Sequence, residues 1–290
     1  MAQGARAMVE RKDANIAAAP MVARSIRVVR TSNFWSVSVL DPNIIALPLG
    51  AGMLGGTMNA LAGGGTFATL PALIAMGLPA NVANATSNVA LLPGAATSAY
   101  GFRDELAPVG GVGHRLLAAI TFVGGLAGSL LLVATPSHAF DVIIPWLLLF
   151  AFVVLAFGTR AANLLHACLT IGPRSLIVAQ AMLGIYGGYF GGGVGLMTTA
   201  IYGLLANVSP RSLFAPRTLM LAMANAAAAI VFVASGIITW GACLPMLAGS
   251  ILGGWFGAKV GKRLPPEAVR VGTLLVTGVT TLVFFWRAYS

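Results

Sequence analysis

No charged side chain occurs anywhere between Asp41 and Arg103. Further charge-free runs cover residues 116–140, 142–159, 175–210 and 218–258. About 20 apolar residues are enough to cross a bilayer, so the longest of these runs must turn back on themselves. Over the whole chain 58% of residues are hydrophobic and 8% are charged, against about 25% charged in an ordinary soluble domain. The chain is therefore a membrane protein that crosses the bilayer several times.

The apolar runs indicate helices and not the strands of a barrel. They show no alternation of polar and apolar residues over segments of about 10, which membrane-spanning strands require. Helices also satisfy every backbone hydrogen bond inside one segment, which the bilayer demands. The sequence predicts an all-α polytopic membrane protein.

The sequence contains an internal repeat. The triple glycine at 63–65 recurs at 191–193, and a second signature recurs at nearly the same offset, with Gly124, Gly125, Gly128 and Pro136 matched by Gly253, Gly254, Gly257 and Pro265. Such a repeat predicts two homologous halves. We divide the chain into a basic tail at 1–43, a first transmembrane repeat at 44–160 and a second at 174–288.

Each half is predicted to contain five helical elements. In the first half, the first element ends near 62, and the other four cover about 66–78, 82–102, 115–134 and 141–158. In the second half they cover about 175–190, 194–206, 212–235, 242–261 and 268–287. The second element has about 13 residues and is too short to span at about 1.5 Å per residue. Because the triple glycine precedes it, we expect a re-entrant hairpin with a glycine tip, followed by three spans.

A hairpin plus three spans gives an odd number of crossings, which predicts inverted repeats with a site at their interface. Under the positive-inside rule the basic connections are then cytoplasmic, namely 103–115, 160–174, 211–217 and 259–270. The connections near Ser137 and Ile238 and the tail lie outside. If each hairpin is instead counted as one crossing, the tail lies inside and the basic cluster at 259–270 lies outside.

The triple glycines have two interpretations. A glycine tip before a short helix exposes N–H groups and the positive end of the helix dipole, which together favour an anion. Small residues also let helices pack closely, and we prefer that interpretation for the pairs Gly124–Gly128 and Gly253–Gly257.

Polar residues open the third element of each half. They are Asn84, Thr86, Ser87 and Asn88 in the first half, and Arg217, Thr218 and Asn225 in the second. Such groups either line a cavity or join helices through hydrogen bonds. Arg217 has no acid within 40 residues, so it is either an anion ligand or a side chain that snorkels to the surface.

The remaining titratable residues lie near predicted span ends. Apart from the acids in the middle of the tail, these are Asp41, Asp104, Glu105, Asp141 and Glu267. The histidines His114, His138 and His166 lie in connections. No carboxylate is thus expected at mid-membrane, and no metal, cofactor or catalytic constellation is predicted. The net charge of +10 is scattered, which argues against nucleic acid. Cys168 and Cys243 suggest no disulfide framework.

One combination of motifs resembles a known family. It consists of the triple glycine at 63–65, Pro71 in the short helix, Gly-Leu-Pro at 77–79 and Ala-Thr-Ser at 85–87 before Pro93. This is similar to the TauE/SafE sulfite exporter family, over residues 44–287. Many members have a lysine where this chain has Asn88. The resemblance therefore gives more weight to Arg217 as the cationic ligand of an anion.

The resemblance implies an inner (plasma) membrane exporter of sulfite or organosulfonates, which is not an enzyme. We expect a small sulfur oxyanion as substrate and the bilayer as surroundings, and we leave open the oligomeric state, a homodimer included. A passive anion channel and a membrane assembly partner are the alternatives. The candidate substrate ligands are Gly63, Gly64, Gly65, Thr66, Thr86, Ser87, Asn88, Gly191, Gly192, Gly193, Arg217, Thr218 and Asn225.

Overall fold

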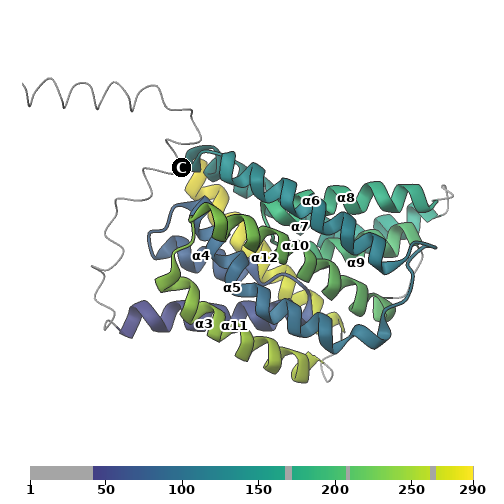
Figure 1. The fold of residues 1–290 in the computed structure, drawn as a ribbon, viewed down its shortest axis with the longest axis horizontal. Coiled ribbons are helices and arrows are strands. Elements are labelled where there is room, and N and C mark those ends of the chain that lie inside the picture. Colours follow the sequence, from purple (N-terminus) through teal and green to yellow (C-terminus); the bar gives the residue numbers. More distant parts are fainter. Residues whose placement is uncertain (1–41, 167–171, 207–209, 262–265, 290) are drawn as a thin grey trace, which may run out of the picture.

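A computed structural model of the chain describes residues 42–166, 172–206, 210–261 and 266–289 (Figure 1). These residues form helices and no strand, apart from an isolated bridge between Val109 and Val112. The all-helical class is confirmed. Nearly all of the tail expected at 1–43, together with Cys168, lies outside the described residues.

The helix bounds follow the expected elements closely. The first half contains α3 (Pro42–Leu61), α4 (Thr66–Ala75), α5 (Ala80–Gly101), the 3-10 turn η2 (Arg103–Glu105), α6 (His114–Ala134) and α7 (Ser137–His166). The second half contains α8 (Pro173–Tyr189), α9 (Val194–Ala206), the 3-10 turn η3 (Pro210–Leu213), α10 (Phe214–Ser235), α11 (Trp240–Gly261) and α12 (Pro266–Tyr289). α7 runs beyond the expected end at 158, because the residues after Gly158 are mostly good helix formers.

Among the residues that the structure describes, five helices are long and apolar enough to cross a membrane. They are α6, α7 over Ser137–Gly158, α10, α11 over Trp240–Val260, and α12 over Glu267–Tyr289. The sixth expected span, α5, has 22 residues but is less apolar, because asparagine, threonine and serine open it. α5 is covered by other helices, so its polar residues are shielded by protein.

The closest helix packing joins one half of the chain to the other. α3 lies along α11, and α8 lies along α6. A Cβ on Gly253 would collide with the Met53 carbonyl of α3, and a Cβ on Gly128 would collide with the Ile185 carbonyl of α8. These contacts confirm the packing interpretation of the later glycine pairs, since only glycine permits such close approach.

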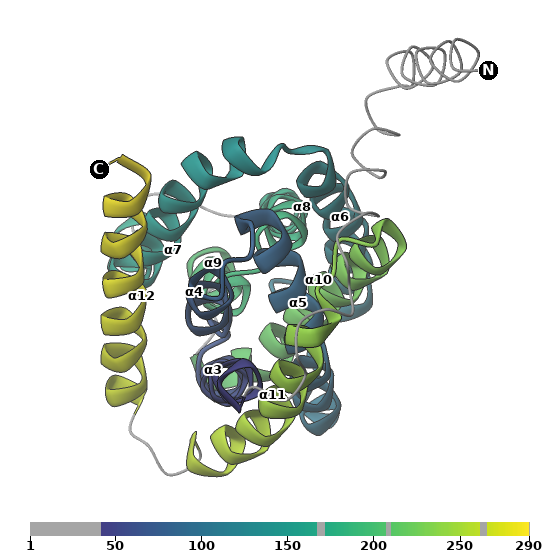
Figure 2. The same ribbon diagram turned by 90° about the vertical axis from the view of Figure 1, so that its left-hand side faces the viewer.

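The two short helices lie inside the bundle. Figure 2 shows α3, α4 and α9 with α7 and α12 on one side and α5, α10 and α11 on the other. In Figure 1, α4 lies toward the left-hand end and α9 toward the right-hand end. Phe67, Leu70 and Leu73 of α4 are completely or almost completely buried. Other helices therefore enclose both short helices.

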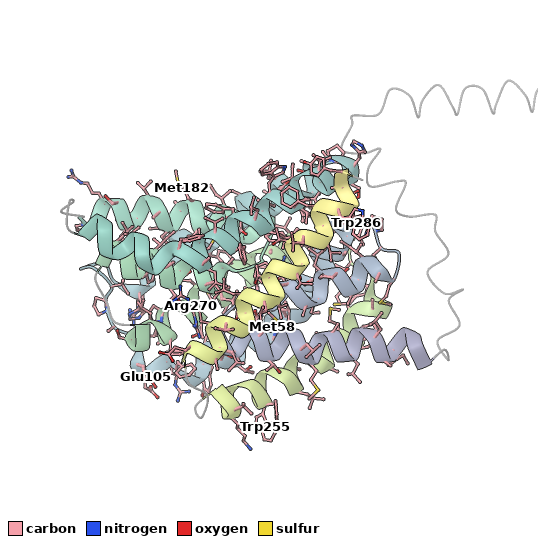
Figure 3. The ribbon with its side chains drawn as sticks, turned by 180° about the vertical axis from the view of Figure 1, so that it is seen from behind. Met58, Glu105, Met182, Trp255, Arg270 and Trp286 are labelled. Carbon is pink, nitrogen blue, oxygen red and sulfur yellow. The ribbon has the colours of Figure 1, made fainter. Side chains whose placement is uncertain are left out.

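Large apolar side chains cover the outside. Met182, Trp255 and Trp286, from α8, α11 and α12, point outward and are more than half exposed (Figure 3). An apolar exterior of this kind is expected where helices face lipid.

Candidate functional site

The two glycine tips meet inside the protein. We call Gly63–Gly65 the first tip and Gly191–Gly193 the second tip, and all six glycines are buried. Gly63, with φ 81°, lies against Gly195, which follows the second tip, so that a Cβ on Gly63 would come 2.6 Å from the Gly195 Cα. Because φ is positive and the space is filled, this contact requires glycine.

The tips differ in how their N–H groups are bonded. At the first tip, the Gly65 N–H donates to Oδ1 of the buried Asn59 at 2.6 Å. At the second tip, the N–H groups of Gly191 and Gly192 make no hydrogen bond with any residue that the structure describes. The second tip therefore has the free donors that an anion needs. Asn59 was missed in the sequence, where it is the one amide in the apolar run before the first tip.

Two asparagines of α5 bind the end of α8. Asn84 Nδ2 donates to the Tyr189 carbonyl at 3.0 Å, and Asn88 Nδ2 donates to the Phe190 carbonyl at 3.5 Å. These carbonyls end α8 and have no partner within the helix. The Oδ1 atoms of both asparagines are buried and make no hydrogen bond within the described part of the chain.

Arg217 lies at the contact between the tips. Its side chain is only 6% exposed, so it does not snorkel to the surface. Its Cζ lies 4.5 Å from the centre of the Phe214 ring, and its Nη2 donates to the Leu61 carbonyl at 3.5 Å. A Cβ on Gly195 would come 3.3 Å from its Cγ, which places the stem of the arginine against the second tip.

The charge of Arg217 is not balanced by a buried acid. Its Nε is buried and has no hydrogen-bond partner among the described residues. Among the residues whose exposure is described, no aspartate or glutamate is buried, and Asp104, Glu105, Asp141 and Glu267 are all exposed. An unpaired buried cation costs free energy, which an anionic ligand would recover.

The hydroxyl groups expected at the site already have partners. Thr86 Oγ1 accepts from the Thr239 N–H at 3.2 Å, and Ser87 Oγ lies 2.5 Å from Thr69 Oγ1. Thr218 Oγ1 donates to carbonyls of its own helix at 3.0 Å. The structure therefore brings together the tips, Asn88 and Arg217, whereas these hydroxyls serve helix contacts in this conformation.

Two other expected ligands are buried at the edges of this region. Thr66 is the first residue of α4, directly after the first tip. Asn225 follows Arg217 by eight residues on α10, which is about 12 Å along a helix. Its Oδ1 is buried and has no hydrogen-bond partner in the described ranges.

A polar chain elsewhere in the bundle escaped sequence reasoning. The Tyr202 hydroxyl donates to Gln180 Oε1 at 2.7 Å, and Gln180 Nε2 donates to Thr121 Oγ1 at 2.5 Å. It links α9, α8 and α6 through buried side chains. Its one signal in the sequence is Gln180, a single amide in an apolar run.

The fold and this centre define a polytopic helical membrane protein with short helices meeting in its interior, an arrangement known from transporters. The sequence model of the family described as sulfite exporter TauE/SafE matches residues 48–284. The chain belongs to this family.

Curated relatives have the same general description. The chain is 25% identical over 259 residues to "Probable membrane transporter protein YfcA" of Escherichia coli K12, covering 89% of this chain and 95% of the relative. It is 29% identical over 245 residues to "Probable membrane transporter protein" of Haemophilus influenzae, covering 81% and 93%. No solved structure matches the chain significantly. The protein is a membrane transporter of the TauE/SafE family.

Proposed function

We propose that the protein exports small sulfur-containing anions, sulfite or organosulfonates, across the inner (plasma) membrane. The observation that carries this proposal is Arg217, a buried cation against two glycine tips with no buried acid among the residues whose exposure is described. The family's description as sulfite exporters supports the choice of anion.

In the proposed complex the anion binds between the tips. The planar guanidinium of Arg217 donates two parallel hydrogen bonds to the sulfur oxygens, which suits an oxyanion. The N–H groups of Gly191 and Gly192 add further donors. When the tips separate, the hydroxyls of Thr86, Ser87 and Thr218 complete the site.

We further propose transport by alternating access between inverted repeats, each with a re-entrant hairpin. The pairing of α3 with α11 and of α8 with α6 supports this arrangement, because the same elements of each half meet in both pairs. This pairing also changes which parts of the protein are expected to move during transport. Since both pairs cross between the halves at glycine contacts, the moving bodies are α3–α11 and α6–α8, rather than residues 44–160 against 174–288.

Export of an anion needs no ion relay inside the protein. A monovalent anion that leaves a cell with about 100 mV, negative inside, gains about 2.3 kcal/mol. That gain corresponds to roughly a 50-fold concentration gradient. The exposure of every described acid is consistent with transport driven by the membrane potential.

The test is sulfite and sulfonate flux in vesicles that contain the wild type, Arg217→Gln or Arg270→Gln. Arg270 is the matched control, because it is exposed and donates to the Ala156 carbonyl at 2.9 Å on the surface of α7. We expect saturable flux that falls at least about 10-fold in Arg217→Gln only. Flux that does not saturate indicates a channel, and unchanged flux in a folded Arg217→Gln protein rejects the site.

A further inference from the structure

Three buried atoms around the second tip have unused hydrogen-bonding capacity. Arg217 Nε is a donor, and the Oδ1 atoms of Asn84 and Asn88 are acceptors. Both asparagine side chains are at most 1% exposed. Buried polar atoms of a native protein nearly always have a partner, so an unpaired donor and two unpaired acceptors point to something that binds there.

The orientation of the two amides is fixed by their surroundings. Asn84 Nδ2 faces the Tyr189 carbonyl, and Asn88 Nδ2 faces the carbonyls of Asn84 and Phe190 at 3.3 and 3.5 Å. Turning either amide over would place its oxygen against a carbonyl oxygen. The nitrogen therefore faces the backbone, and the unpaired atom is an acceptor and not a donor.

The donor and one acceptor lie at the two ends of a short segment. A Cβ on Gly191 would overlap with Asn88 Oδ1, and a Cβ on Gly195 would touch the Arg217 stem at 3.3 Å. Four residues of chain span at most about 14 Å, and the positive φ angles of Gly191 and Gly193 make this segment shorter. Asn88 and the stem of Arg217 therefore contact the same short segment of chain.

Gly191 packs directly against the amide of Asn88. Any side chain at this position would collide with Asn88 Oδ1, and φ 72° also favours glycine, so the acceptor lies against the backbone of the second tip. The second tip thus offers donors at Gly191, Gly192 and Arg217 beside an acceptor at Asn88.

We propose that the transported anion also carries a hydrogen-bond donor, as a hydroxyl- or amino-substituted sulfonate or hydrogensulfite does. This inference rests on the function proposed above. The sulfur oxygens bind the N–H groups and Arg217, while the O–H or N–H of the same molecule donates to Asn88, with Asn84 beside it. An anion without a donor leaves the buried acceptor unpaired, so the site selects against it.

The test uses two ligands that differ only in this donor. 2-Hydroxyethanesulfonate and propane-1-sulfonate have the same number of non-hydrogen atoms, with a hydroxyl in one where the other has a methyl. We expect the wild type to bind the hydroxylated ligand at least about 10-fold more tightly, a difference of about 1.4 kcal/mol. Asn88→Leu should reduce this preference to less than about 3-fold by removing the acceptor.

Asn81→Leu is the control. Asn81 lies on the same helix, but its Oδ1 accepts from the neighbouring Val82 N–H at 2.9 Å, so the preference should persist. Equal affinity of the two sulfonates in the wild type overturns the inference and leaves the proposed function intact. Binding of neither sulfonate, with no binding of sulfite either, overturns the proposed function itself. The comparison in the wild type decides the matter even if Asn88→Leu does not fold.

Discussion

Asn88 and Arg217 make the same contact at the two glycine tips. Asn88 Nδ2 donates to the Phe190 carbonyl and Arg217 Nη2 donates to the Leu61 carbonyl, each at 3.5 Å. The donors, 88 and 217, are separated by the same number of residues as the acceptors, 61 and 190. A neutral amide thus binds one helix end and a cation binds the other. The two contacts therefore match in geometry, but of the two only the contact at Leu61 carries a charge.

The contact between the tips can be measured with a pair of glycine substitutions. Gly63 and Gly77 have similar positive φ angles, 81° and 86°, so alanine costs about 1–2 kcal/mol of backbone strain at both. Gly77 has nothing within 4 Å, whereas Gly63 touches Gly195. We expect Gly63→Ala to lower thermal stability clearly more than Gly77→Ala does, and to abolish flux. Equal effects would show that the tips do not touch.

The packing of α8 on α6 and of α3 on α11 gives a second prediction. Gly128→Ala and Gly253→Ala each place a methyl group into a backbone carbonyl and should cost about 2 kcal/mol or more. Gly272→Ala, on α12 with nothing within 4 Å, should be neutral or stabilise by up to about 1 kcal/mol. Thermal unfolding in detergent provides the comparison, and similar melting temperatures for all three variants would contradict the packing.

The buried chain of Tyr202, Gln180 and Thr121 gives a third. Tyr202→Phe leaves Gln180 Oε1 without its donor and should cost about 1–3 kcal/mol. Adding Gln180→Leu removes the unpaired amide, while Thr121 still donates to the Leu117 carbonyl at 2.7 Å. The two changes should therefore cost less together than the sum of the single variants. Simple additivity of the unfolding free energies would argue against the chain.

The orientation of the protein in the membrane gives a fourth prediction. Gly113 and His138 are exposed and lie just outside the two ends of the α6 span, so cysteines there should react from opposite sides of the membrane. The basic connection near Gly113 should be cytoplasmic and His138 external. Both native cysteines are replaced beforehand, and impermeant reagents are applied to cells and to inverted vesicles. A Gly113 cysteine labelled from outside would reverse the assignment.

Helix positions could be predicted from the sequence, because charge-free runs and glycines fix where apolar helices begin and end. The expected short segment at 66–78 ends at Ala75, since Gly77 adopts a positive φ before Pro79. The pairing of α3 with α11 could not be predicted, because it depends on which glycine faces which carbonyl. A repeat in the sequence does not contain that information.

The candidate site was predictable in part. Arg217 and the triple glycines were identified because charge and glycine are conspicuous in apolar segments. The bonds of Thr86 to Thr239 and of Ser87 to Thr69 join residues from different helices, so they emerge only in the fold. Asn59 was missed for the same reason, since its role depends on the turn that brings Gly65 back to it.

The crossing of α3 to α11 also bears on synthesis of the chain. When the ribosome has made residues up to His166, α3 has no α11 to cover its glycine face. The first half therefore enters the bilayer with its best packing surface unmatched, and it stays so until α11 follows. Neither half can reach its final structure alone, so quality control should degrade a chain truncated before α11. Two separately expressed halves should be stable only together.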